Sequence, residues 1–162
     1  MHKTTTATSL AGLLKPETIN LDLKEQKKSA ALREVAVMLH ANKSVANFDA
    51  FFGEILERER ISNTALGHDI AIPHARTEQC TDILIAVGRS SGGIDFESKE
   101  NGPVRLLFLI GTPKQMVTEY LRIVGNLARL LRRDEIRQQL LDAPDAAAFI
   151  RIIAESTAAD AE

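Results

Sequence analysis

The sequence predicts an α/β fold, a small mixed β-sheet flanked by helices on both faces. Two short and almost continuous apolar runs, Ile83–Val87 and Val104–Ile110, have the length and character of buried strands. Apolar residues recur at helical spacing both before and after these runs. Because strands and helices interleave, with helices concentrated towards the end of the chain, we expect the helices to cover the sheet.

The first half of the chain is expected to hold a strand and two helices. Ile19, Leu21 and Leu23 alternate with polar residues, which is strand periodicity. A helix is expected from about residue 26 to residue 40, where apolar side chains lie three and four positions apart. Asn47 can cap a second helix. The residues expected on the buried side of that helix are Phe48, Phe51, Phe52, Ile55 and Leu56.

Three more helices are expected in the second half of the chain, after the Val104–Ile110 strand. Pro144 fits the first turn of the last helix, where the hydrogen bond that a proline lacks is not made. The apolar residues whose spacing marks the three helices are Leu121, Val124, Ala128 and Leu131, then Ile136, Leu140 and Leu141, then Phe149, Ile152 and Ile153.

Length and composition favour a single globular domain. The chain has 162 residues, 44% hydrophobic and 26% charged, and we expect one domain over residues 1–162 with flexible ends at 1–15 and 156–162. The net charge of −2 leaves no basic field for nucleic acid or an anionic membrane. The composition therefore excludes binding to either by charge alone.

Cys80 is the only cysteine, so no intramolecular disulfide can form and a reducing compartment is expected. The Thr-rich stretch from Met1 to Ser9 lacks the apolar core of a signal peptide. No apolar run approaches the roughly 20 residues of a membrane helix. We expect a cytoplasmic protein without direct membrane insertion and without a cofactor.

Of the four histidines, His2 lies in the expected tail and His40 near a helix end, where neither needs a special role. His74 is different, because it follows a short apolar stretch, Ile70–Ile72, that we expect to form a buried strand. Pro73 would end that strand, since it has no backbone N–H to donate. His74 is thus expected just past a strand end, a common position for a site residue in α/β folds.

A neutral imidazole at that position can accept a phosphoryl group and release it to another nucleophile. Phosphoryl transfer mainly requires alignment and hydrogen-bond donors around the equatorial oxygens. Backbone amides near Gly67, and the guanidinium group of Arg58 or Arg76, are candidate donors. The residues alone also permit a structural role for the Pro73–His74 pair.

The run Thr64–Ala75, which contains Ala-Ile-Pro-His, resembles the signature of the mannitol/fructose and nitrogen-regulatory enzyme IIA family of the phosphotransferase system. Arg58-Glu59 is similar to the Arg-Glu pair of that family, whose arginine lies at the active site. The later segments that resemble family blocks are Gly93–Phe96, Val104–Ile110 and Leu121–Leu131. The resemblance extends from about residue 19 to residue 154.

This resemblance implies a phosphotransferase with a phosphohistidine intermediate on His74, supported by Arg58. It also implies phosphate donation by an HPr-type phosphocarrier, with an enzyme IIB or a regulated protein as the next partner. The absence of a fused IIB or membrane segment slightly favours the nitrogen-regulatory type. Gly67, His68 and Tyr120 are the residues expected to bind the phosphate or to support the site.

The chain departs from the family pattern at three positions. It has His68 where a small or polar residue is usual, Asp69 where glycine is usual, and Tyr120 where many members have a second histidine. A carboxylate near His74 would repel its phosphoryl group, and tyrosine can donate a hydrogen bond but not become cationic. We therefore expect a less stable phosphorylated form, unless Asp69 points away and pairs with an arginine such as Arg76. A transfer-incompetent sensor or interaction module is the alternative.

Three other interpretations are kept open. Cys80 and His74 could form a nucleophilic pair, although no third orienting residue is evident. His68 and Asp69 could join those two as metal ligands, although their spacing matches no zinc pattern, so no metal site is predicted. The run Arg129, Arg132 and Arg133, placed on a helix, is a solvated face or a docking surface for an acidic partner.

Overall fold

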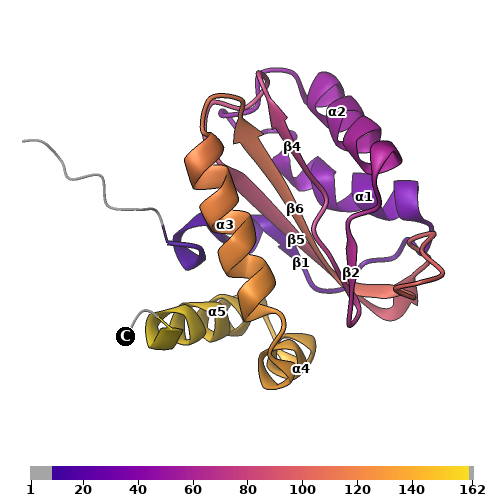
Figure 1. Cartoon of the computed structure of the whole chain (residues 1–162), viewed down its shortest axis with the longest axis vertical. Helices are drawn as coiled ribbons and strands as arrows, with labels where there is room; N and C mark the ends of the chain where they lie inside the picture. The colour runs from indigo at the N-terminus through magenta and orange to yellow at the C-terminus, as the bar shows by residue number, and fades with distance from the viewer. Residues whose placement is uncertain (1–8, 161–162) are drawn as a thin grey trace, which may run out of the picture.

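The computed structural model describes residues 9–160 and, over that range, contains a mixed β-sheet between two helical layers (Figure 1). Six strands form the sheet. They are β1 (Ile19–Asn20), β2 (Ala65–Gly67), β3 (Ile70–Ala71), β4 (His74–Thr77), β5 (Leu84–Ile94) and β6 (Val104–Pro113). The predicted fold class is confirmed.

The sheet has the order β1-β5-β6-β3-β2, with β4 also paired to β6. β5 and β6 form the long antiparallel centre. β1 runs parallel to β5, and both β3 and β4 run parallel to β6. β3 and β4 therefore lie one after the other along the same side of β6.

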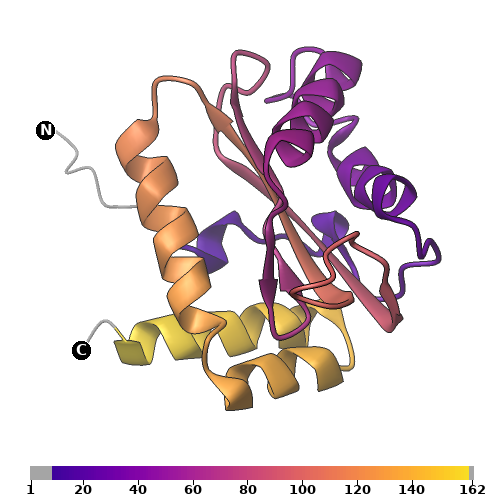
Figure 2. The same cartoon turned by 45° about the vertical axis from the view of Figure 1, so that its right-hand side comes forward.

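Two helices, α1 (Lys28–Ala36) and α2 (Phe48–Ile61), cover one face of the sheet. The other face carries α3 (Val117–Leu130), α4 (Asp134–Asp142) and α5 (Ala146–Asp160), and Figure 2 shows α3 on the side of the sheet opposite α1 and α2. Short 3₁₀ segments occur at Ala11–Leu13, Pro16–Thr18 and Val37–Leu39. Over the described residues, no helix is both long enough and apolar enough to cross a membrane.

Alternation along β6 explains why both faces are covered. Leu106, Phe108 and Ile110 belong to the core beneath α3–α5, whereas Leu107 and Leu109 belong to the core beneath α1 and α2. All five side chains are fully buried. Since successive strand residues point to opposite faces, this apolar run can be buried only between two layers.

Helix α2 lies against β6 at Gly111. A Cβ atom at this position would be 2.7 Å from Cε1 of Phe51 and 2.9 Å from Sγ of Cys80. Such distances are shorter than carbon atoms tolerate, so the glycine permits the close approach. This contact sets α2 beside the part of the sheet where His74 begins β4.

The expected helix boundaries hold best where a cap is present. Asn47 caps α2 as predicted, its side chain accepting a hydrogen bond from the Ala50 N–H at 3.0 Å. Pro144 lies before α5 and not within its first turn, because Asp145 accepts the hydrogen bond from Ala148 N–H that starts this helix. In the N-terminal region, the predicted strand pairs with β5 over Ile19–Asn20, and the Leu23 N–H donates one further hydrogen bond to the Arg89 carbonyl at 2.9 Å.

The structured part of the chain reaches further than the expected flexible ends. Leu10 and Leu14 are buried in the core beneath α3–α5, and Ser156 is buried on α5. These three residues fall within the ends that were expected to be flexible, 1–15 and 156–162, but their side chains are packed in the fold. Residues 1–8, with His2, and residues 161–162 lie outside the described range.

Candidate functional site

His74 is the first residue of strand β4. The chain leaves the sheet briefly between β3 and β4, and both strands pair with β6. Ile70 pairs with Leu106 on β6, and His74 pairs with Ile110 four residues further along. At the break, Pro73 has no N–H, and its carbonyl accepts a hydrogen bond from the Ile110 N–H at 2.9 Å. Thus His74 follows a strand end as expected, but it also begins the next strand.

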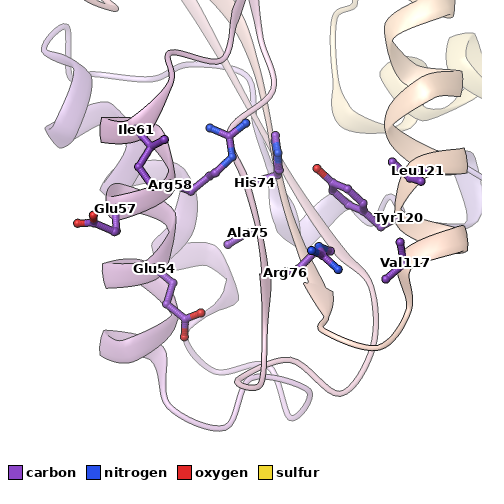
Figure 3. Close-up of a pocket in the computed structure, with 10 residues that line it drawn as sticks. All are labelled: Glu54, Glu57, Arg58, Ile61, His74, Ala75, Arg76, Val117, Tyr120 and Leu121. Atoms are coloured by element: carbon purple, nitrogen blue, oxygen red, sulfur yellow. The ribbon is translucent and has the colours of Figure 1, made fainter.

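A pocket of about 490 Å³ surrounds His74 between α2, β4 and the start of α3 (Figure 3). Its lining combines two arginines, two carboxylates, two aromatic rings and four apolar side chains. The lining residues are Glu54, Glu57, Arg58, Ile61, His74, Ala75, Arg76, Val117, Tyr120 and Leu121. Three separate segments of the chain therefore build one site.

A backbone hydrogen bond fixes the tautomer of the His74 ring. Its Nδ1 lies 2.9 Å from the carbonyl oxygen of Ile72. A carbonyl can only accept, so Nδ1 carries the proton and Nε2 keeps its lone pair. Burial lowers the pKa of His74, and the charge of Arg58 lowers it further, against the opposing effects of the Ile72 hydrogen bond and Glu59. The ring is therefore neutral near pH 7, with a nucleophilic Nε2.

Arg58 and Glu59 take opposite directions at the end of α2. Arg58 extends into the pocket towards His74, and its Nη1 donates a hydrogen bond to the Ser62 carbonyl at 3.0 Å (Figure 3). Glu59 is buried, with 5% of its surface exposed. Its carboxylate accepts hydrogen bonds from the Thr64 N–H at 2.8 Å and hydroxyl at 2.6 Å, and it pairs with Lys28 Nζ at 2.9 Å. Glu59 thus ties the helix end that carries Arg58 to the start of β2.

Tyr120 and Arg76 occupy the other side of His74. Tyr120 lies in the first turn of α3, and its ring centroid is 5.4 Å from that of His74. The guanidinium carbon of Arg76 is 5.9 Å from the Tyr120 ring centroid. The structure therefore brings His74, Arg58 and Tyr120 together, as the sequence predicted, and places Arg76, the other candidate donor, in the same pocket.

The other two predicted site residues, Gly67 and His68, do not line this pocket. Gly67 ends β2 and His68 lies in the turn that leads to β3, and Gly67, His68 and Asp69 have φ values of 86°, 54° and 69°. The register places Ile70, which follows the turn, four residues along β6 from His74, or about 13 Å. The structure therefore does not bring Gly67 and His68 into the pocket around His74.

Asp69 at this turn is paired with an arginine, but with a different one from that suggested by the sequence. Arg105 Nη2 lies 2.8 Å from its carboxylate, and Arg105 Nε is hydrogen-bonded to the same oxygen at 3.2 Å. Asp69 is thus compensated at the far end of β3. The expected repulsion between Asp69 and a phosphoryl group on His74 does not apply.

Comparison with known proteins identifies the family. Residues 12–156 match the family model described as "Phosphoenolpyruvate-dependent sugar phosphotransferase system, EIIA 2". The chain belongs to this EIIA family. It is 34% identical over 145 residues to a nitrogen regulatory protein of Bradyrhizobium diazoefficiens, covering 90% of this chain and 94% of that protein.

Two further proteins illustrate the range of this EIIA family. Over 141 residues the chain is 37% identical to a fructose-specific EIIABC component of Bacillus subtilis. The aligned region covers 87% of this chain but only 22% of that longer protein. The crystal structure of IIA-Ntr from Neisseria meningitidis superimposes with a TM-score of 0.83 at 25% identity, covering 89% of this chain and 98% of the other.

The geometry of this EIIA chain does not support the cysteine or metal interpretations. Cys80 is buried, and burial, with a smaller effect of Glu54, raises the pKa of its thiol to about 12. A thiol with such a pKa is protonated at neutral pH and is a poor nucleophile. Among the described residues, no three His, Cys, Asp or Glu side chains are grouped so as to hold a metal ion.

The arginine run does not form the continuous helical face that we expected. α3 ends at Leu130, so Arg129 lies on the helix, whereas Arg132 and Arg133 lie in the connection to α4. Arg129 donates a hydrogen bond to Asn126, and Arg133 pairs with Glu135 at 3.2 Å. Two of the three guanidinium groups are thus engaged by nearby side chains.

Exposed apolar residues at the pocket were missed from the sequence. Ile61 is 72% exposed at the end of α2, and Leu121 is 61% exposed on α3 together with the exposed Val117. Leu121 belongs to the helical repeat that predicted α3, and the repeat by itself did not show that its side chain is exposed. Helical spacing gives the apolar stripe but not its limits, so it cannot separate a core position from an exposed position beside a site.

Proposed function

We propose that this EIIA-family chain is a phosphoryl carrier that accepts the group on Nε2 of His74. The observation that carries the proposal is the hydrogen bond from Nδ1 to the Ile72 carbonyl, which leaves the Nε2 lone pair available. The lowered pKa of His74 keeps that lone pair unprotonated at neutral pH. Arg58 adds a guanidinium group on one side of the ring.

In the proposed step, the Nε2 lone pair forms a bond to phosphorus. The bond between phosphorus and the donor atom breaks, and its electron pair stays on the donor. The Nδ1 proton remains on the ring, where the Ile72 carbonyl accepts its hydrogen bond and stabilises the positive charge that develops there. Arg58 can donate two hydrogen bonds to the equatorial oxygens of the transferred group.

We infer that the donor is an HPr-type phosphocarrier protein and that the acceptor is an enzyme IIB or a regulated protein. The exposed Ile61, Val117 and Leu121 beside the pocket offer an apolar contact to such a protein. Similarity to a nitrogen regulatory protein and to IIA-Ntr favours the nitrogen-regulatory type. No nucleic-acid partner is proposed.

The test is incubation with phosphoenolpyruvate, enzyme I and an HPr-type carrier, followed by intact mass measurement. The proposal predicts an acid-labile gain of one phosphoryl group. His74→Gln should abolish the gain, whereas His40→Gln should retain it, because His40 packs against Phe48 away from the pocket. Phosphorylation of the His74→Gln protein would assign the acceptor elsewhere.

The same experiment decides between the carrier and the alternative module that only binds partners. No mass gain with either HPr or its nitrogen-branch homologue would favour the module. If the chain is phosphorylated, the ratio of the rates with the two carriers tests the branch. A faster reaction with HPr than with the nitrogen-branch carrier would contradict the proposed nitrogen-regulatory type.

A further inference from the structure

His74 has an arginine on each side, and the two come from different elements. Arg58 reaches it from the last turn of α2, whereas Arg76 lies two residues after His74 on β4. Residues two apart on a strand point to the same face. His74 and Arg76 therefore face the same pocket, as Figure 3 shows.

The aromatic ring of Tyr120 lies within reach of both groups. Its centroid is 5.4 Å from the His74 ring centroid and 5.9 Å from the Arg76 guanidinium carbon. A guanidinium near an aromatic face is attracted by the ring electrons and loses part of its freedom. Tyr120 thus holds the Arg76 side chain in the vicinity of His74.

The guanidinium of Arg76 has little else to bind. Its one hydrogen bond runs from Nη1 to the Lys114 carbonyl and is long, at 3.4 Å. Among the ion pairs of the described residues, none includes Arg76. Its donors are therefore available to a ligand at little cost.

The carboxylates of the pocket are occupied by other partners. Glu54 accepts a hydrogen bond from the Thr77 hydroxyl at 2.8 Å, and Glu57 pairs with Arg60. Neither forms an ion pair with Arg76. Because neither Arg58 nor Arg76 forms an ion pair with another described residue, an added phosphoryl group would be the anion that lies between them.

We propose that Arg76 binds the phosphoryl group of phosphorylated His74, with the Tyr120 ring orienting its guanidinium. This inference rests on the proposed carrier function. Phosphorylation adds about 1.5 to 2 negative charges at neutral pH. Arg58 and Arg76 together supply two positive charges from opposite sides. The sequence suggested that tyrosine at position 120 leaves this side of the site without a cation. In the proposal, Arg76 supplies that cation.

The test is the equilibrium constant for phosphoryl exchange between the phosphorylated carrier protein and this chain. Docking changes the rate at which equilibrium is reached but not the position of the equilibrium. Arg76→Gln should lower the phosphorylated fraction, with a decrease in the equilibrium constant of about threefold to tenfold. The equilibrium constant of Arg76→Lys should lie between those of Arg76→Gln and the wild type, because an ammonium group keeps the charge but lacks the planar fork of donors.

Arg151→Gln is the matched control, because it removes one positive charge from an exposed position on α5 that does not line the pocket. It should leave the equilibrium constant unchanged. High salt should reduce the difference between wild type and Arg76→Gln, since exposed charges are screened. Circular dichroism of each variant checks that the fold is retained.

Tyr120 provides a second and independent variant. Tyr120→Leu removes the aromatic face, and the effect of Arg76→Gln should then become smaller in the Tyr120→Leu background than in the wild type. Equal equilibrium constants for wild type, Arg76→Gln and Arg151→Gln would overturn the inference while leaving the carrier function intact. Failure of the wild-type chain to accept any phosphoryl group would instead overturn the carrier function itself.

Discussion

The two ends of the Thr64–Ala75 segment differ in both backbone and environment. At one end, the last residue of β2 and the two residues of the β2–β3 turn have positive φ values, and Asp69 is paired with Arg105. At the other end, His74 sits in regular strand geometry inside a pocket, with its Nδ1 fixed by a backbone carbonyl. At the turn end the charge of Asp69 is paired with Arg105, whereas at the pocket end guanidinium donors and the Nε2 lone pair of His74 are available.

This difference shows that residues adjacent in a motif need not act on the same ligand. β3 and β4 run in the same direction along β6, and each strand residue advances by about 3.3 Å. The β2–β3 turn therefore lies at a distance from His74, the first residue of β4. The turn end shapes the sheet, and in the proposed function the pocket end carries the chemistry.

The largest expected effect concerns Glu59, because it links the pocket helix to Thr64, the first residue of the segment. Glu59→Ala would leave Lys28, whose side chain is 11% exposed, without its buried partner. Breaking a buried ion pair on one side typically costs about 3–5 kcal/mol. Urea denaturation should show a loss of this order.

Glu57→Ala is the control for that measurement, since Glu57 pairs with Arg60 at the surface. Its free energy of unfolding should change by no more than about 0.5 kcal/mol. If both variants were equally stable, Glu59 would not be the link between α2 and β2.

The next effect separates the two ends directly by a pair of matched substitutions. Arg58→Lys at the pocket should slow phosphoryl transfer about tenfold, because lysine cannot offer two parallel donors to phosphate oxygens. Arg105→Lys at the turn should leave the rate within about twofold of wild type. Rapid-quench kinetics with the phosphorylated carrier measures both rates, and equal slowing would contradict the separation of the ends.

A smaller effect is expected in the pH dependence. Burial lowers the pKa of His74, so its lone pair should remain available at pH values below the ordinary imidazole pKa of about 6.5. The transfer rate should therefore begin to fall only below that value. An acidic limb centred above about 6.5 would contradict a buried, neutral acceptor.

The same lowered pKa has a consequence for stability. Well above pH 6.5 the His74 ring is neutral in both the folded and the unfolded chain. As the pH falls from there through the lower folded pKa, the unfolded chain binds the proton first, and stability is lost. His74→Gln should remove this contribution, so this variant should lose less stability than wild type on acidification.

The smallest effect is expected for Asp69→Gly at the turn. The ion pair with Arg105 is partly exposed, and glycine adopts the φ of 69° without strain. We expect the phosphorylated fraction at fixed donor concentration to remain within about twofold of wild type. A clear shift of Asp69→Gly towards the phosphorylated form would instead show that Asp69 repels the phosphoryl group in the wild type.

Much of the fold was predictable because it depends on local patterns. The continuous apolar runs of β5 and β6 and the Asn47 cap of α2 are such patterns, and the structure contains all of them. The strand order depends on contacts between distant segments, which periodicity does not encode. The placement of β3 and β4 along one strand could not be predicted for this reason.

The site was predictable in part for the same physical reason. His74 and Arg58 were identified through the motifs that they belong to, and Tyr120 through its aligned position. Arg76 as part of a group with Tyr120, and Arg105 as the partner of Asp69, depend on how α3 and β6 pack against the segment. Proximity along the chain suggested Gly67 and His68, and the direction of the strands places them away from the pocket.

The most direct test of the account is to identify the phosphorylated atom. Nitrogen-15 NMR of the histidine-labelled, phosphorylated chain distinguishes the two ring nitrogens through their coupling to phosphorus. The hydrogen bond between Nδ1 and the Ile72 carbonyl predicts phosphorus on Nε2 of His74, with the proton retained on Nδ1. Phosphorus on Nδ1, or on any residue other than His74, would contradict the account.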